Sequence, residues 1–355
     1  MRTAILQSSV GIGGRSKVLA TSIEVLADKS HSIDIHTLSE PDKINRFLHH
    51  YQVDGTDISG VTHRGSSVPG TIYQQPILNI AARGDLRKYD LVFNSNNCVR
   101  FLPAGPRYLH YIHFPTSRNP RIDPKYGRLP YRIASVPLTL ISALTTAKPD
   151  GHVFANSKFT LKHTRKAYHS PDAQVLYPPA LESVRLSKFS GEGVVSVGSF
   201  HPNKRQLLQL RMAKRLPDTE FRIIGSTASE SYYETCREYV SEHGLNNVTL
   251  LTDVSDQRLR DELERSRVFL HTMENERFGI APVEGINCGC VPVVHNSGGQ
   301  REVVPNSEYR FDNPADCEAI LNDILSGKSP STEEMRAHLK QFTEANFRSA
   351  LSEYI

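Results

Sequence analysis

The chain has 355 residues, of which 38% are hydrophobic and 23% are charged. A single hydrophobic core rarely grows to this length, so we expect a globular protein of two domains. The formal charge of +4, from 42 Lys+Arg against 38 Asp+Glu, is too small to indicate a nucleic-acid-binding protein.

The first residues predict a strand and a glycine loop, without the long apolar stretch of a secretory signal peptide. The longest uncharged stretch, residues 133–147, is shorter than the ~20 apolar residues that span a bilayer. The five cysteines lack zinc-site spacing and favour free thiols in a reducing compartment. We therefore expect a cytoplasmic protein whose membrane contact is at most peripheral, on the cytoplasmic face.

Short apolar runs alternate with amphipathic helix patterns along the chain. The first half predicts strands at Thr3–Leu6, Ile33–His36, Leu91–Asn94, Tyr108–Ile112, His152–Ala155 and Gln174–Tyr177. The second half predicts strands at Val194–Val197, Glu220–Ile224, Val248–Leu251, Val268–His271 and Val291–Val294. Helix patterns include Lys17–Asp28, Lys204–Arg215 and Ser229–His243. This alternation is typical of parallel sheets covered by helices on both faces.

Residues 178–193 separate the two series and contain prolines and glycines without a clear period, so we interpret them as a linker. We expect an α/β protein with Rossmann-like, doubly wound domains at 1–177 and 194–331. Two such sheets are expected to face each other across a cleft, where ligands bind at the carboxyl ends of the strands. Residues 332–355 are predicted to form a helix that packs back on the first domain.

The most informative segment follows the strand Val268–His271 and contains two carboxylates, Glu276 and Glu284. Pro282 predicts a helix start near it, which places Glu284 in the first turn and Glu276 in the preceding loop. Carboxylates accept hydrogen bonds from sugar and ribose hydroxyls, and exposed backbone amides, including those of the 297–299 turn, suit phosphate. A solvated pair of surface acids is the alternative.

This segment is similar to the E-x7-E motif of retaining GT-B glycosyltransferases (glycosyltransferase group 1). The likeness is closest to GDP-mannose-dependent α-1,2-mannosyltransferases that extend dolichyl-diphosphate oligosaccharides. Their LHTM-x-NE-x-FG and HNSGG patterns resemble residues 270–279 and 295–299 here. The likeness covers most of the second predicted domain and scattered points of the first, and it implies the GT-B fold.

The resemblance implies that Glu276 contacts the hydroxyls of the donor sugar and that Glu284 holds the ribose. The other donor-binding residues that it implies, through backbone groups, are Phe278, Gly279, Ile280 and Ala281. Both glutamates are then binding and orienting groups, unlike the two carboxylates of glycoside hydrolases.

A second segment, residues 197–204, resembles the family's G-R-x-x-x-x-K pattern, in which Arg and Lys hold the donor diphosphate. Lys204 matches the Lys, but Ser199 stands at the position of the Arg. The mannosyltransferases carry Arg where His201 stands. We expect Lys204 to neutralise the diphosphate with His201 or Arg205. A solvated lysine at a helix start is the alternative.

Two segments of the first predicted domain complete the candidate site. The Gly13-Gly14 loop lacks the third glycine of a dinucleotide fingerprint, because Ser16 stands there, and it fits an approach to the donor or a plain tight turn equally well. His113 ends a predicted strand in a His-x-Pro pattern similar to the family's sugar-contacting histidine. A structural histidine is the alternative.

A basic stretch with interleaved tyrosines predicts contact with an anionic membrane surface or a lipid diphosphate. Its cationic residues are Arg118, Arg121, Lys125, Arg128 and Arg132. A solvated loop explains the same residues.

We therefore expect a retaining hexosyltransferase that moves mannose from GDP-mannose to a saccharide acceptor, lipid-linked or on a cell-surface glycan. No metal or other cofactor is expected, because no D-x-D follows a predicted strand. Two alternatives stay open. One is another GT-B enzyme, such as a sugar-nucleotide epimerase, and the other is a non-catalytic sugar-nucleotide-binding protein, which the departure at Ser199 would favour.

Overall fold

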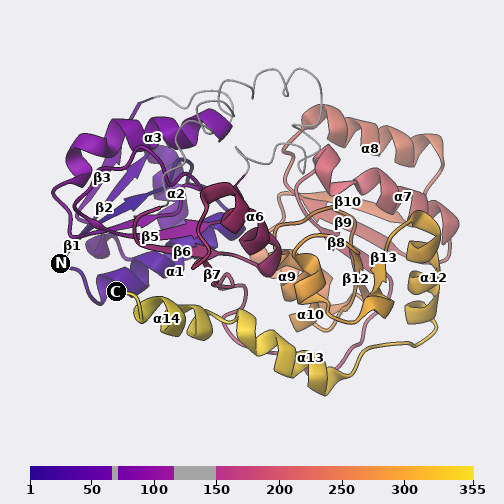
Figure 1. The fold of residues 1–355 in the computed structure, drawn as a ribbon. Coiled ribbons are helices and arrows are strands. Elements are labelled where there is room, and N and C mark those ends of the chain that lie inside the picture. Colours follow the sequence, from indigo (N-terminus) through magenta and orange to yellow (C-terminus); the bar gives the residue numbers. More distant parts are fainter. Residues whose placement is uncertain (66–70, 116–148) are drawn as a thin grey trace. The chain divides into compact units, whose positions relative to one another are not determined.

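The computed structural model describes residues 1–65, 71–115 and 149–355, which form two compact units (Figure 1). The first unit comprises Met1–Glu182 and Phe342–Ile355, and the second comprises Ser183–Gln341. The chain thus enters the second unit after Glu182 and returns to the first unit at Phe342.

The first unit is built on a parallel sheet of seven strands in the order β3-β2-β1-β4-β5-β6-β7. The strands are β1 (Arg2–Leu6), β2 (Ser32–Thr37), β3 (Gly60–His63), β4 (Leu91–Asn94), β5 (Arg107–Ile112), β6 (His152–Ala155) and β7 (Gln174–Val175). The order reverses beside β1, so the loops after β1 and β4 flank the point at which ligands bind in open α/β sheets.

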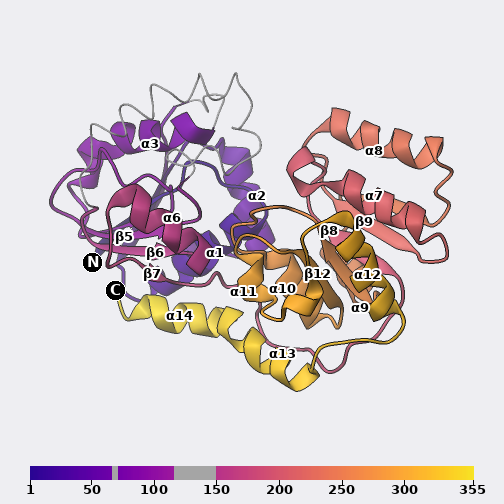
Figure 2. The ribbon, with the colours of Figure 1, turned by 45° about the vertical axis from the view of Figure 1, so that its right-hand side comes forward.

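Helices cover both faces of this sheet because successive strand residues point to opposite sides. Ile5 joins the core under α1 (Gly14–Ala27), whereas its neighbours Ala4 and Leu6 join the core under α3 (Thr71–Leu86). Among the described residues of the unit, the other helices are α2 (Pro41–Tyr51), α6 (Lys158–Tyr168) and α14 (Glu344–Ser352). Figures 1 and 2 both show α14 beside α1, where Phe347 and Leu351 enter the core.

The second unit has a parallel sheet of six strands in the order β10-β9-β8-β11-β12-β13. The strands are β8 (Val194–Val197), β9 (Phe221–Gly225), β10 (Val248–Thr252), β11 (Val268–His271), β12 (Val291–His295) and β13 (Arg310–Phe311). The neighbours β8 and β11 bring the loops that follow them to the same edge of the sheet.

Two apolar clusters bury the faces of this second sheet. One cluster joins Leu210 of α7 (Gln206–Arg215) and Cys236 of α8 (Glu230–Glu242) to β9, and these two helices lie side by side in Figures 1 and 2. The other joins the sheet to α9 (Asp256–Glu264) and α10 (Ile280–Asn287). The remaining helices are α11 (Gln300–Val303), α12 (Pro314–Leu325) and α13 (Thr332–Leu339).

The predicted α/β class with two Rossmann-like parallel sheets is confirmed. The sequence patterns missed β3 and β13, and the single helix predicted for residues 332–355 is wrong. That segment forms α13, a 3-10 turn at Lys340–Phe342, and α14. Thr343 caps α14 by accepting a hydrogen bond from the Asn346 amide, so the chain starts a new helix there.

Candidate active site

Glu276 lies in the loop after β11, and its carboxylate is held by three donors. Lys204 Nζ lies 2.7 Å from Oε2, and His271 Nε2 lies 3.2 Å from the same oxygen. The Arg277 amide donates to Oε1 at 2.9 Å. The structure therefore brings together the two residues that sequence motifs predicted for the donor sugar and its diphosphate.

The charge of Glu276 follows from these contacts. Burial raises the pKa of the Glu276 carboxyl, but the charge of Lys204 and the hydrogen bond from His271 outweigh it and hold the pKa well below its usual range. Burial also lowers the pKa of His271, against the opposing effect of Glu276. At neutral pH the cluster is a carboxylate, an ammonium and a neutral imidazole.

Lys204 is presented by the end of a short 3-10 turn, Pro202–Lys204, rather than by the start of a helix as predicted. Thr272 Oγ1 donates a 2.7 Å hydrogen bond to the Lys204 carbonyl, and Gln209 Nε2 donates to Thr272 Oγ1 at 2.9 Å. Because Thr272 is buried and directly follows β11, it ties the β8 loop to the β11 loop.

Of the other residues expected beside Lys204, His201 and Ser199 bond to residues close in sequence, whereas Arg205 contacts the loop after β11. The ring Nδ1 of His201 accepts the Asn203 amide and caps the 3-10 turn. Arg205 Nη1 pairs with Glu274 and donates to the Thr272 carbonyl at 3.4 Å. The Ser199 carbonyl accepts a 2.9 Å hydrogen bond from Gln206.

Helix α10 begins at Ile280, two residues before the predicted start at Pro282. Gly279 has a φ of 107°, a backbone conformation that favours glycine, and it ends the loop so that the helix can start at once. Glu284 is the fifth helical residue and not a first-turn residue as predicted. The first amides, at Ile280 and Ala281, lack intrahelical acceptors and give this end its partial positive charge.

The turn at Ser297-Gly298-Gly299 has a different role from the predicted one. Its amides were expected to be exposed and suited to phosphate, but the Gly299 amide donates a 2.7 Å hydrogen bond to the Glu276 carbonyl. Ser297 Oγ accepts the Asn275 amide at 2.8 Å. A Cβ at Gly298 would lie 2.3 Å from the Glu276 carbonyl oxygen. The turn therefore braces the Glu276 loop by close backbone packing.

In the first unit, Gly13 ends the loop between β1 and α1, as the pattern predicted, whereas Gly14 is already the first residue of α1, three residues before the predicted helix start at Lys17. Gly13 has a φ of 127°, which requires glycine. The Tyr51 hydroxyl accepts the Gly13 amide at 2.8 Å and donates to the Gly13 carbonyl at 2.9 Å. Ser16 Oγ accepts the Gly11 amide at 3.2 Å, so the residue that replaced the third glycine holds the loop.

His113 directly follows β5 and is partly buried. Its Nε2 lies 2.9 Å from Ser95 Oγ, and its amide donates to Asn97 Oδ1. Burial is the main cause that holds the pKa of His113 well below its usual range, and the positive charge of Arg15 in the first turn of α1 lowers it further. His113 is thus a neutral imidazole at the carboxyl edge of the first sheet.

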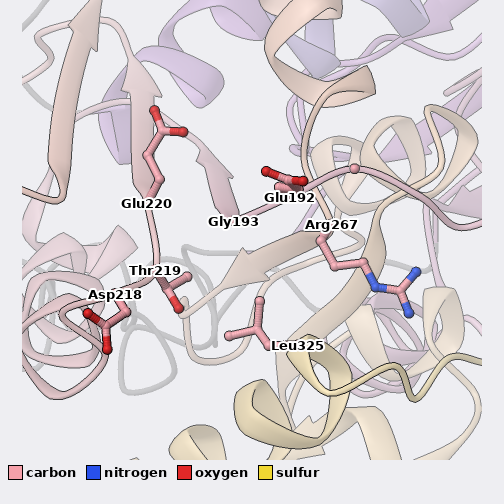
Figure 3. A pocket seen from close by; sticks show the side chains of 8 residues that line it. Glu192, Gly193, Asp218, Thr219, Glu220, Arg267 and Leu325 are labelled. Atoms are coloured by element: carbon pink, nitrogen blue, oxygen red, sulfur yellow. The ribbon is translucent and has the colours of Figure 1, made fainter.

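A polar hollow of about 420 Å³ lies at the opposite, amino-terminal edge of the second sheet (Figure 3). Gly193, Glu220 and Arg267, which line it, immediately precede β8, β9 and β11. In Figure 3 the side chains of Asp218 and Glu220 extend in different directions, so these two carboxylates do not converge on a ligand. Because ligands of α/β sheets bind at the carboxyl edge, we place the candidate site around Glu276.

Several other expectations concern surfaces and thiols. The basic residues predicted to contact a membrane lie outside the described residues: Arg118, Arg121, Lys125, Arg128 and Arg132. Within the described ranges, no helix is both long and apolar enough to cross a membrane.

All five cysteines are free thiols, as predicted, and burial raises the pKa of Cys288 to about 11.

Residues 187–345 match the family model described as Glycosyl transferases group 1. The chain carries a group 1 glycosyltransferase domain. The matched residues contain the whole Glu276 and Lys204 cluster, and the predicted resemblance to this family is confirmed.

Relatives of this glycosyltransferase include named mannosyltransferases. An alpha-1,3/1,6-mannosyltransferase from Rhizomucor pusillus is 24% identical, over 98% of this chain and 88% of the relative. The mouse GDP-Man:Man(3)GlcNAc(2)-PP-Dol alpha-1,2-mannosyltransferase is 28% identical, over 56% of this chain and 46% of the relative. The chain therefore matches less than half the length of the mouse protein.

The fold of this glycosyltransferase also has solved counterparts. Sucrose-phosphate synthase from Thermosynechococcus elongatus superposes with a TM-score of 0.77 at 15% identity, covering 99% of this chain and 98% of that one. At this identity the likeness shows the fold alone, which is the predicted GT-B fold.

Sequence reasoning did not select His271, Thr272 or Tyr51. A signal for His271 was present, since a histidine that ends the apolar run Val268–His271 lies at the carboxyl edge of a sheet. No pattern marks Tyr51, because its contact with Gly13 joins residues 38 positions apart.

Proposed function

We propose that this glycosyltransferase moves mannose from GDP-mannose to a saccharide hydroxyl, with retention at the anomeric carbon. The main evidence for the proposed donor site is the 2.7 Å contact between Lys204 Nζ and Glu276 Oε2. It places an ammonium suited to a diphosphate beside a carboxylate suited to sugar hydroxyls. The names of the relatives, which include GDP-Man transferases, support mannose as the sugar.

In the proposed complex, the donor binds along the carboxyl edge of the second sheet. Lys204 and the first amides of α10, at Ile280 and Ala281, meet the diphosphate charge, which makes a divalent metal unnecessary. Glu276 accepts hydrogen bonds from the sugar, and Glu284, one turn into α10, accepts them from the ribose. His113 of the first unit is proposed as a further residue that hydrogen-bonds a sugar hydroxyl.

The proposed transfer forms one bond and breaks one. The acceptor oxygen bonds to the anomeric carbon while the bond from that carbon to the diphosphate oxygen breaks. The acceptor proton passes to the departing diphosphate, and GDP leaves. Lys204 stabilises the negative charge that develops on the diphosphate, and Glu276 contributes by orientation.

The acceptor is proposed to be a lipid-linked saccharide, which the enzyme meets as a peripheral protein on the cytoplasmic face of a membrane. The name of the mouse relative, which contains the acceptor Man(3)GlcNAc(2)-PP-Dol, supports this choice. The basic residues between Arg118 and Arg132 are the proposed contact with the anionic surface.

The test begins with a thermal-shift comparison of GDP-mannose, UDP-glucose and ADP-glucose. Ligand at 100 times its Kd stabilises the folded state by about 2.7 kcal/mol, so the true donor gives the largest rise in Tm. Release of GDP from GDP-mannose is then measured with lipid-linked saccharides. Binding of GDP-mannose without GDP release on any acceptor would identify a non-catalytic sugar-nucleotide-binding protein instead.

Two alanine variants assign the donor contacts. Glu276→Ala is expected to abolish sugar transfer while GDP still binds. Glu284→Ala is expected to weaken the binding of GDP itself. The exposed Glu238 of α8 provides the matched control, since Glu238→Ala removes a carboxylate from the same unit. Transfer that persists in Glu276→Ala would refute the proposed sugar contact.

A further inference from the structure

His271 is a buried histidine that the proposed transfer reaction does not use. It is the last residue of β11 and is only 3% exposed. Its Nε2 lies 3.2 Å from Glu276 Oε2, and its ring stacks on Phe269 with 6.5 Å between ring centroids. The strand and the stacking fix the ring, so the imidazole is a rigid support for the Glu276 loop.

The protonation of His271 follows from its surroundings. Burial and the nearby Lys204 ammonium lower its pKa, so the ring is neutral and carries one N–H. A nitrogen lone pair at 3.2 Å from a carboxylate oxygen would be repelled, so the proton sits on Nε2. His271 therefore donates to Glu276 without adding a charge.

Hydrogen bonds within the protein occupy most of the acceptor positions of the Glu276 carboxylate. A carboxylate offers about four acceptor positions. Lys204 and His271 share Oε2, and the Arg277 amide occupies one position on Oε1. Among the described residues no fourth donor reaches this carboxylate, so one position on Oε1 stays open for a sugar hydroxyl.

Binding of a diphosphate changes this balance, because its oxygens compete with Glu276 for Lys204. Once the ammonium turns to the diphosphate, His271 and the Arg277 amide are the donors that still hold the carboxylate. The neutral imidazole of His271 is fixed on a strand and is not attracted by the charge of the diphosphate. The ammonium of Lys204 is charged and lies on a flexible side chain, so it can move to the diphosphate.

We propose that His271 is a positioning residue that keeps the Glu276 carboxylate aimed at the donor sugar when Lys204 engages the diphosphate. The inference rests on the proposed donor site. His271 acts on binding of the sugar half of the donor and leaves binding of the nucleoside diphosphate half unaffected.

The test compares Kd values for GDP-mannose and for GDP by isothermal titration calorimetry in wild type, His271→Leu and His271→Gln. A hydrogen bond to a charged group corresponds to about 10- to 100-fold in affinity. His271→Leu is expected to raise the Kd for GDP-mannose by that factor and the Kd for GDP by less than about twofold. His271→Gln, which restores an N–H donor, is expected to recover most of the affinity for GDP-mannose.

The control is His243→Leu, which replaces an exposed histidine at the end of α8 in the same unit. A merely structural role for His271 would weaken both ligands equally in His271→Leu, and that result would overturn the inference. Failure of His271→Gln to recover GDP-mannose binding would overturn it too. Wild type that binds no sugar nucleotide would refute the proposed function itself, and the inference with it.

A spectroscopic test examines the His271 ring in the wild-type protein itself. In wild type labelled with nitrogen-15 histidine, the His271 signals, assigned by their loss in His271→Gln, are expected to show the neutral Nε2–H tautomer at pH 7. They are expected to shift further with GDP-mannose than with GDP. The Nδ1–H tautomer, or equal shifts with both ligands, would overturn the inference.

Discussion

Lys204 Nζ and Glu276 Oε2 lie 2.7 Å apart although the two residues are 72 positions apart in the chain. Their side chains are 26% and 14% exposed, so each charge is largely removed from water and depends on the other. A diphosphate that binds Lys204 must therefore draw the ammonium away from Glu276 or share it with that carboxylate. Removing either member leaves the other charge partly buried and uncompensated.

Lys204→Met tests the role of the ammonium in transfer. Loss of a group that stabilises the developing charge typically lowers the rate by about 100-fold or more. We expect kcat/KM for GDP-mannose to fall by about that factor. Without Lys204, burial dominates and the pKa of Glu276 rises, so the acid limb of the pH–rate profile moves to higher pH.

Lys214→Met is the control for this variant, because Lys214 is an exposed lysine in the last turn of α7. It is expected to leave kcat/KM and the acid limb unchanged. Equal effects of the two substitutions would show that Lys204 acts only through the general charge of the unit.

Gly298→Ala tests the brace under the Glu276 loop. The added Cβ would meet the Glu276 carbonyl oxygen at 2.3 Å, and the residue has a φ of 72°. Gly244 has a similar φ of 59° with nothing within 4 Å of the same Cβ position. Gly244→Ala is expected to cost about 1 kcal/mol of unfolding free energy from the backbone alone. Gly298→Ala is expected to cost more and also to lower kcat/KM.

Urea unfolding and steady-state kinetics check both glycine variants. If Gly298→Ala and Gly244→Ala lose equal stability and both keep full activity, the close backbone packing at Gly298 has no part in holding Glu276.

Tyr51→Phe tests the clamp on the glycine loop of the first unit. It removes the hydroxyl that both accepts from and donates to Gly13, and we expect the Gly13 amide to exchange its hydrogen at least about tenfold faster. Tyr239→Phe is the control, since the Tyr239 hydroxyl has no hydrogen-bond partner within residues 1–65, 71–115 and 149–355. Unchanged exchange at Gly13 in Tyr51→Phe would mean that the loop is held by other contacts.

Acid is expected to destabilise the first unit before its carboxylates titrate. Burial lowers the pKa of both His36 and His110 to about 4 from an unfolded value near 6.5. The unfolded chain therefore binds protons between pH 6.5 and 4 that the folded unit does not. Stability is fully present above pH 6.5 and falls by about 1.4 kcal/mol per pH unit for each histidine as the pH drops.

Urea unfolding at pH 7, 6 and 5, followed by circular dichroism, measures this slope. His36→Asn is expected to reduce the slope by about 1.4 kcal/mol per pH unit, whatever its effect on stability at pH 7. A slope that His36→Asn leaves unchanged would show that the buried histidine takes up its proton in the folded state.

The strands buried on both faces could be predicted from the sequence because they are continuous apolar runs, such as Val268–His271. The two missed strands lie at sheet edges. β3 (Gly60–His63) is half exposed along its length, and β13 has only two residues, so neither shows an apolar run. Their positions depend on partners that are distant in sequence.

Motif spacing could predict Glu276 and Lys204 singly but not the contact between them. That contact depends on β8 and β11 being neighbours, which no local pattern records. The Ser297-Gly298-Gly299 turn was misinterpreted for the related reason that a free amide and a bonded amide have the same sequence. Only the position of the Glu276 carbonyl distinguishes a ligand-binding turn from a supporting one.

The return of α14 to the first unit affects the order in which the protein can fold during synthesis. Phe347 and Leu351 complete a core whose other residues are made some 170 positions or more earlier, before all of the second unit. The ribosome therefore produces the second unit entire while the first still exposes the apolar surface that α14 will cover. We expect the second unit to fold first, with closure of the first unit by α14 as a later step.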